Sequence, residues 1–143
     1  MNYEDVKAAF MGYLTESLAG DEVAASAMYQ DDALVEFPQS GERFRGKDNF
    51  IPWRGEYPAG TLEFEVRSIR GEGDTWIAEG RIRYDDGDPL TFVGILHFRG
   101  DVVDRETIYV TEPFPPDESR ARYAEGSELD ATPGLPERVR TST

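Results

Sequence analysis

Cysteine is absent from this chain of 143 residues, and histidine occurs once, at His97. Without cysteine there is no disulfide framework, no thiolate nucleophile and no zinc cluster, and a reducing compartment is expected. One histidine and scattered acidic residues do not make a set of metal ligands, so we expect no metal site. The chain also has no glycine-rich phosphate loop and no nucleophile elbow. We therefore expect no cofactor.

Long hydrophobic runs are missing as well. No stretch is apolar for long enough to span a membrane, and residues 1–10 mix charged with apolar side chains, unlike a signal peptide. Basic residues are few, with 15 against 29 acidic ones and a net charge of -14. Such a surface repels phosphate groups and anionic lipid. We expect a soluble cytoplasmic protein with no nucleic-acid partner and no membrane contact.

What the chain does contain is enough for one folded domain. Hydrophobic residues make up 38% of it and aromatic residues 12%, which is too rich for a disordered chain. Five of the nine prolines fall after residue 112, where apolar residues become rare. We expect one domain over residues 1–116. Residues 117–143 are expected to form a proline-containing tail, partly disordered, with a short helix near residues 117–125.

Apolar residues first follow a helical period and then alternate. The spacing of Tyr3, Val6 and Phe10 predicts an amphipathic helix that ends near Gly20, and Asp21 suits the N-cap of a second helix. A strand over residues 33–37 and a short helix near residues 47–56 follow. From residue 62 onward a period of two predicts four strands joined by tight turns. Helices followed by an antiparallel meander indicate an α+β fold with the helices on one sheet face.

Three stretches in this order resemble a known family. Residues 13–21 read Tyr-Leu-Thr-Glu-Ser-Leu-Ala-Gly-Asp, residues 31–46 read as strand, proline, polar loop and glycine, and residues 95–99 read Ile-Leu-His-Phe-Arg. Over roughly residues 3–114 the chain resembles the nuclear transport factor 2-like superfamily, which includes the SnoaL-like polyketide cyclases and the ketosteroid isomerases. The resemblance implies a cone-shaped, curved antiparallel sheet that packs against N-terminal helices and encloses an apolar pocket.

The resemblance supports the fold but not the isomerase activity. Tyr13 matches the tyrosine that donates a hydrogen bond to the oxyanion in that family. The proton-transferring aspartate is replaced by Phe37, and the protonated second aspartate is replaced by Leu96. Steroid isomerisation needs a base that moves the proton and donors that hold the enolate. The chain therefore lacks the carboxylates of the isomerases.

The resemblance also implies which residues line the pocket. They are mostly aromatic: Phe37, Trp53, Tyr57, Trp76, Ile82, Tyr84, Phe92, Leu96 and Phe98. Such a wall suits a small hydrophobic molecule. The alternative is a filled core, because apolar residues at strand period also make an ordinary interior. The hollow cones of this superfamily favour the pocket.

Three residues are candidates for catalysis: Tyr13, Arg105 and Tyr109. The resemblance turns Arg105 and Tyr109 toward the cavity, where an arginine must meet a carboxylate. In the alternative register Arg105 pairs on the surface. Tyr13 fits either a core tyrosine with a satisfied hydroxyl or a ligand contact. His97 and Glu36 are expected to face away from the cavity.

Two hypotheses for function follow. In the first, the chain is a SnoaL-like protein that binds a small hydrophobic molecule, either as a binding protein or as a cofactor-independent enzyme of isomerase, cyclase or hydrolase type. In the second, it is a non-catalytic homodimeric scaffold. The outward row of Thr91, Val93, Ile95 and His97 is apolar enough for a two-fold interface.

Overall fold

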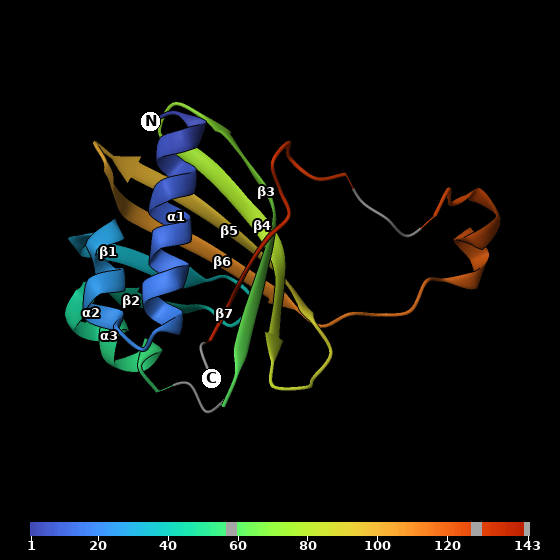
Figure 1. Ribbon diagram of the computed structural model, residues 1–143, viewed down its shortest axis with the longest axis horizontal. Coiled ribbons are helices and arrows are strands. Elements are labelled where there is room, and N and C mark those ends of the chain that lie inside the picture. The colour runs from blue at the N-terminus through green and yellow to red at the C-terminus, as the bar shows by residue number, and fades with distance from the viewer. Residues whose placement is uncertain (57–59, 127–129, 142–143) are drawn as a thin grey trace.

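In a computed structural model, which describes residues 1–56, 60–126 and 130–141, helices cover one face of a curved sheet (Figure 1). The helices are α1 (Tyr3–Leu18), α2 (Glu22–Ala25), the 3-10 turn η1 (Ser26–Met28) and α3 (Lys47–Arg54). The side chain of Asp21 accepts a hydrogen bond from the Ala24 N–H, so it caps α2 as the sequence predicts. The α+β cone architecture is confirmed.

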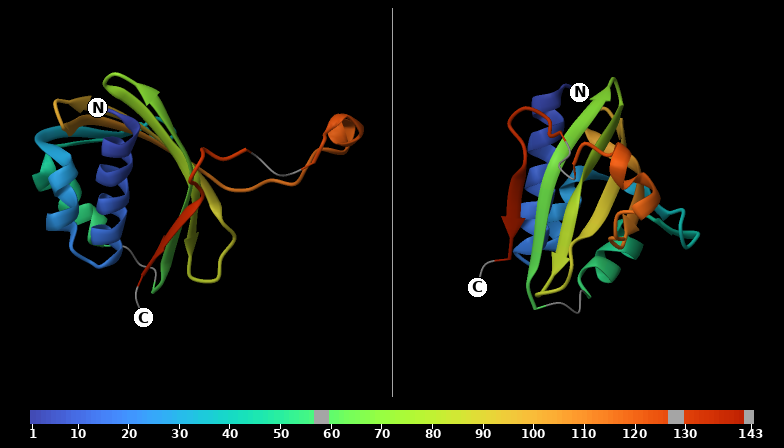
Figure 2. Two further views of the ribbon diagram at one scale, coloured as in Figure 1. Left: turned by 45° about the horizontal axis from the view of Figure 1, so that its top comes forward. Right: turned by 90° about the vertical axis from the view of Figure 1, so that its right-hand side faces the viewer.

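Within the described residues the sheet has seven strands in the order β2-β1-β6-β5-β4-β3-β7. Their bounds are β1 Tyr29–Phe37, β2 Glu42–Arg45, β3 Leu62–Glu72, β4 Thr75–Tyr84, β5 Leu90–Arg99, β6 Val102–Thr111 and β7 Glu137–Arg140. Strands β3 to β6 form the predicted antiparallel meander. Strand β1 runs parallel to β6, and β2 pairs with β1 where the sequence suggested a loop. Figure 2 shows how strongly the sheet curves around the helices.

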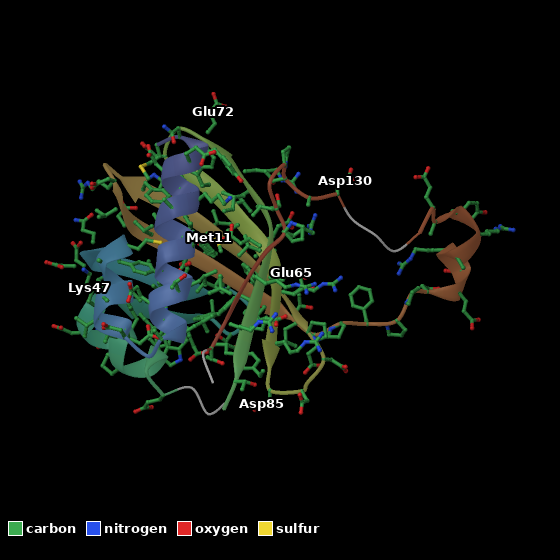
Figure 3. All side chains as sticks on the ribbon, viewed as in Figure 1. Met11, Lys47, Glu65, Glu72, Asp85 and Asp130 are labelled. Atoms are coloured by element: carbon green, nitrogen blue, oxygen red, sulfur yellow. The ribbon has the colours of Figure 1, made fainter. Side chains whose placement is uncertain are left out.

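The core lies between α1 and the concave face of the sheet, where side chains fill the space (Figure 3). Val6, Phe10 and Leu14 of α1 are at most 4% exposed, and they recur at the predicted helical spacing. On the sheet side, Val66 and Leu96 are fully buried. In the part of the chain that the structure describes, no helix is long and apolar enough to cross a membrane.

After β6 the chain leaves the body. Residues 112–126, which we call the arm, are all exposed and include the 3-10 helix η2 (Glu118–Tyr123). The arm extends from the sheet on the side away from the helices (Figures 1 and 2). It carries the rings of Phe114 and Tyr123, which are 78% and 71% exposed.

The chain then returns to the sheet, past Asp130 (Figure 3), and β7 pairs antiparallel with β3. Leu135 is buried, and Arg138 pairs with Glu65. Residues 137–140 were expected to lie in a tail, so the structure differs here. Leu135 and Val139 are the only large apolar side chains over residues 130–141, too few to indicate a strand from the sequence.

Candidate functional site

A cavity of about 280 Å³ lies between α1, α3 and the concave face of the sheet. Most of its wall is aromatic or aliphatic, and six elements contribute the rings: Phe10 and Tyr13 of α1, Phe37 of β1, Trp53 of α3, Phe64 of β3, Tyr84 of β4 and Phe92 of β5. The rings support one another. Trp53 stacks on Phe44 at 4.9 Å and meets Phe37 edge-on at 5.5 Å between ring centroids.

The structure places most of the predicted pocket residues on this wall. Phe37, Trp53, Ile82, Tyr84 and Phe92 all line the cavity. Trp76, Leu96 and Phe98 do not: they are at most 6% exposed and pack in the core beyond it. In that core the Trp76 indole N–H donates to the Gly73 carbonyl at 2.9 Å. Tyr57 lies outside the described residues.

Tyr13 lies on the cavity wall, in the C-terminal half of α1. Its ring meets Tyr29 edge-on at 5.8 Å, and the Arg54 guanidinium lies 5.2 Å from its centroid. This helix position follows from the spacing of Phe10 and Leu14, which flank Tyr13 on the buried face of α1. Tyr13 therefore joins the apolar wall to the polar groups described below.

Arg105 and Tyr109 lie on the other side of the sheet. The Arg105 side chain is 56% exposed and donates two hydrogen bonds to the Glu36 carboxylate, at 3.0 and 3.2 Å. Tyr109 is 37% exposed on the same outer face. The expectation that these two side chains point into the cavity is wrong. The surface pairing of Arg105, the alternative interpretation of the sequence, is the one that occurs.

The reason is a β-bulge in β6. Asp104 has no partner in the β5–β6 ladder, so it is an extra residue in its strand. Val103 before the bulge and Glu106 after it both point inward, whereas strict alternation from Val103 would turn Arg105 inward. One inserted residue thus exchanges an arginine for a glutamate at the cavity.

Glu106 belongs to a buried polar cluster that sequence reasoning missed. Its Oε1 atom accepts hydrogen bonds from the Tyr29 hydroxyl at 2.6 Å and from Arg54 Nη2 at 3.0 Å. Arg54 Nη1 also donates to the Tyr29 hydroxyl at 2.9 Å, which closes a triangle. Glu106 and Arg54 are 5% and 4% exposed, and both line the cavity. Three polar side chains, from β6, α3 and β1, therefore meet at one side of an apolar cavity.

Aromatic rings hold the Arg54 guanidinium in place. Among the described residues, its central carbon lies 5.1 to 5.4 Å from four ring centroids, those of Tyr13, Tyr29, Phe50 and Trp53. Burial works against the charged form of Arg54, but its neighbours Tyr13, Tyr29 and Glu106 outweigh this and keep the pKa of Arg54 well above its ordinary value. Burial also raises the pKa of Tyr29 well above its usual range. The cluster thus holds a charged arginine and a protonated tyrosine at neutral pH.

Little in the sequence announces this cluster. Arg54 ends the short helix α3, and a charged residue at a helix end usually faces solvent. Glu106 required knowledge of the bulge. Residues 62–111 mostly alternate between apolar and polar side chains, and strict alternation in β6 would put Glu106 on the outer face. Glu106 faces the cavity because one extra residue is inserted before it.

The outer face carries the remaining candidates. Glu36 points away from the cavity, as alternation predicts, and accepts hydrogen bonds from Arg105 and Thr107. His97 is exposed, and its Nδ1 atom lies 2.6 Å from Oδ1 of Asp104. Over residues 1–56, 60–126 and 130–141, no cluster of three or more ligating side chains is arranged to hold a metal ion.

Comparison with known proteins agrees with this fold. The model of the SnoaL-like domain family matches residues 10–105. A protein of unknown function from Burkholderia xenovorans LB400, described as NTF-2-like, is 38% identical; the match covers 87% of this chain and 97% of that chain, with a TM-score of 0.79. No curated protein matches.

Two more distant solved structures share the fold. A proposed ketosteroid isomerase from Kribbella flavida is 22% identical over 90% of this chain and 93% of its own, with a TM-score of 0.75. A proposed polyketide cyclase from Sinorhizobium meliloti is 20% identical over 76% of this chain and 100% of its own, with a TM-score of 0.62. At these identities the likeness concerns the fold alone.

Proposed function

Because the chain belongs to the SnoaL-like domain family, we propose that it binds a small hydrophobic molecule in its cone cavity. The observation that carries this proposal is the cavity of about 280 Å³ with its aromatic wall and its buried cluster of polar side chains. Ligand sites in proteins commonly combine an apolar wall with a few convergent polar groups. Chemistry on the bound molecule would use the chain's own side chains, with Tyr13 in contact with the ligand. Arg105 and Tyr109 take no part, because they lie on the outer face.

The test uses a variant in which a larger side chain fills the cavity, and a control variant with the same change on the outer face. Ile108 lines the cavity, whereas Ile77 on the neighbouring part of the sheet faces solvent and is 42% exposed. A neutral fluorescent probe such as N-phenyl-1-naphthylamine is expected to bind the wild type and Ile77→Trp. Ile108→Trp is expected to bind at least about tenfold more weakly, because the indole occupies the ligand's space. Equal binding by the two variants would place the probe outside the cavity and contradict the proposal.

The same proposal separates this chain from the ketosteroid isomerases. The positions that resemble the two isomerase carboxylates hold Phe37, on the cavity wall, and Leu96, in the core. Neither side chain can transfer a proton. We expect no turnover of a Δ5-3-ketosteroid, followed by the change in ultraviolet absorbance on conjugation. Efficient isomerisation would show that another residue replaces the missing base.

A second candidate function, a homodimeric scaffold, is favoured by an apolar patch on the outer sheet face. Ile77 pairs with Ile95 across β4 and β5, and Val93 pairs with Tyr109 across β5 and β6. Ile77 and Tyr109 are 42% and 37% exposed. These four residues form a continuous surface that includes Val93 and Ile95 of the predicted row, and an isologous pairing of two copies would bury it.

Analytical ultracentrifugation tests this second candidate function by measuring the oligomeric state. At micromolar concentration we expect a dimer for the wild type and a monomer for Ile95→Glu, because the substitution places two like charges near the two-fold axis. Val23→Glu serves as the matched control: Val23 is 72% exposed on α2, far from the patch in sequence and on the helical side of the sheet. A monomeric wild type would remove the scaffold proposal.

A further inference from the structure

The two carboxylate oxygens of Glu106 have different surroundings. Oε1 accepts from both Tyr29 and Arg54. In the part of the chain that the structure describes, no side chain or backbone group donates a hydrogen bond to Oε2. It lies 3.7 Å from the position that a Cβ atom on Gly94 would take. Both Glu106 and Gly94 line the cavity. Because residue 94 has no side chain, the space in front of Oε2 stays open.

This oxygen sits in a wall that is otherwise mostly apolar. A carboxylate oxygen removed from water needs a hydrogen-bond donor, and leaving it without one is unfavourable. Water can donate to Oε2 while the cavity is empty. A purely apolar ligand would displace that water without donating a hydrogen bond to Oε2. A ligand with a hydroxyl or N–H group next to Oε2 would replace the hydrogen bond that the water donates.

Charge narrows the ligand class further. Arg54 already donates to Glu106 and Tyr29, and its positive charge lies against the Glu106 carboxylate at 3.0 Å. An anionic ligand next to Oε2 would be repelled at close range by the negative charge of the Glu106 carboxylate. A neutral donor has no such penalty, and its hydrogen bond to a charged acceptor is of the stronger kind.

We propose that the cavity selects compact, neutral aromatic molecules that carry a hydroxyl or N–H group, and that this group donates to Glu106 Oε2. The inference rests on the proposed function, that the cavity binds a small hydrophobic molecule. It adds that Glu106 determines which molecules bind. Tyr29 and Arg54 act as positioning residues, because they hold Oε1 and thereby turn Oε2 toward the ligand.

The test compares indole with benzofuran, which has the same rings and an oxygen atom in place of the N–H group. Titration followed by ligand-observed NMR gives both dissociation constants. A hydrogen bond to a charged acceptor contributes on the order of ten- to hundredfold in affinity, so we expect indole to bind at least about tenfold more tightly. Indole-2-carboxylate, the anionic probe, is expected to bind more weakly than indole.

The outcomes separate this inference from the proposed function. Equal binding of indole and benzofuran, or tightest binding of the carboxylate, overturns the inference and leaves a hydrophobic cavity that binds ligands. Absence of binding by all three probes overturns both. Preference for indole supports both.

A variant assigns the preference to Oε2. Gly94→Ala adds one methyl group 3.7 Å from this oxygen, an ordinary contact distance, and leaves the Arg54–Glu106 pair in place. We expect the preference for indole over benzofuran, taken as the ratio of their dissociation constants in this variant, to fall to near one. Glu106→Gln removes the charge and is expected to reduce the preference in the same direction. A preference that persists in folded Gly94→Ala would show that the donor binds elsewhere and would overturn the inference.

Discussion

Two glutamates in this molecule, Glu106 of β6 and Glu36 of β1, each accept hydrogen bonds from an arginine at close to 3 Å. In the pair of Glu106 with Arg54 both side chains are at most 6% exposed. In the pair of Glu36 with Arg105 the arginine is 56% exposed. Removing one member of a buried pair leaves a charge without solvent or partner, whereas an exposed partner is readily solvated.

The first prediction compares the two arginines directly. Arg54→Leu is expected to lower the free energy of unfolding by about 3–5 kcal/mol, because Glu106 loses its buried partner. Arg105→Leu, the matched control, is expected to lower it by at most about 1 kcal/mol. Urea denaturation followed by tryptophan fluorescence measures both. Similar losses for the two variants would mean that the Arg54 site is open to water.

The second prediction concerns pH. The hydrogen bond from Arg105, helped by that from Thr107, holds the pKa of Glu36 below its ordinary value of 4.5. A carboxyl whose pKa is lowered by folding stabilises the protein above its unfolded pKa and loses this contribution as the pH falls through the folded pKa. The stability difference between wild type and Glu36→Gln should therefore be largest near neutral pH. It should shrink as the pH drops below 4.5, measured by urea denaturation at a series of pH values. A difference that does not vary with pH would contradict the proposed role of the charge.

At the scale of elements, two glycines show how differently a helix and a sheet respond to one methyl group. A Cβ on Gly80 of β4 would lie 1.8 Å from the Glu65 carbonyl oxygen of β3, beside the bulge in that strand. Gly12 lies inside α1, and a Cβ there meets nothing within 4 Å. The two strands are therefore close together because residue 80 has no side chain.

The third prediction follows from this contrast. Gly80→Ala is expected to destabilise the protein by about 1–3 kcal/mol or more, because β3 and β4 must separate. Gly12→Ala is expected to stabilise it by about 1 kcal/mol, because alanine is the better helix former and the space is empty. Thermal unfolding compares the two melting temperatures with that of the wild type. A Gly80→Ala protein as stable as the wild type would show that the sheet adapts at the bulge.

Elements with a strong local signal could be predicted from the sequence. The spacing of apolar residues gave α1, Asp21 gave the start of α2, and alternation gave β3 to β6. Short strands without that signal were missed: three of the four residues of β2 are charged, and β7 has one apolar residue. Their pairing depends on partners far away in the chain, which local pattern cannot show.

The candidate site also has a part that could be predicted from the sequence and a part that could not. Tyr13, Phe37, Trp53 and Phe92 could be placed on the cavity wall by the family resemblance. For the strand residue Phe92, alternation points the same way. Glu106 could not, since the bulge at Asp104 reverses the alternation and no residue type marks it. A single inserted residue therefore decided which charged side chain faces the cavity.

For the molecule as a whole, the arm is the part that packs least. All of its residues are exposed, and it carries Arg120 and Arg122 in η2. The fourth prediction is that trypsin cleaves first after these two arginines, because the arm fits a protease site without unfolding of the body. Mass spectrometry of a time course identifies the first cut. Early cleavage within the sheet would contradict the arrangement, and Arg120→Gln with Arg122→Gln is the control that removes the arm sites.

The return of the chain after the arm has a consequence for solubility. A sheet has two edges, and unpaired backbone groups on an edge attract strands of other molecules. Strand β2 forms one edge and is short and highly charged. The other edge would be β3 at Glu63–Val66, but β7 covers it. A chain that stops before Glu137 would keep every residue of the cavity and expose this edge of β3. We expect it to aggregate through edge-to-edge strand pairing while its cavity remains intact.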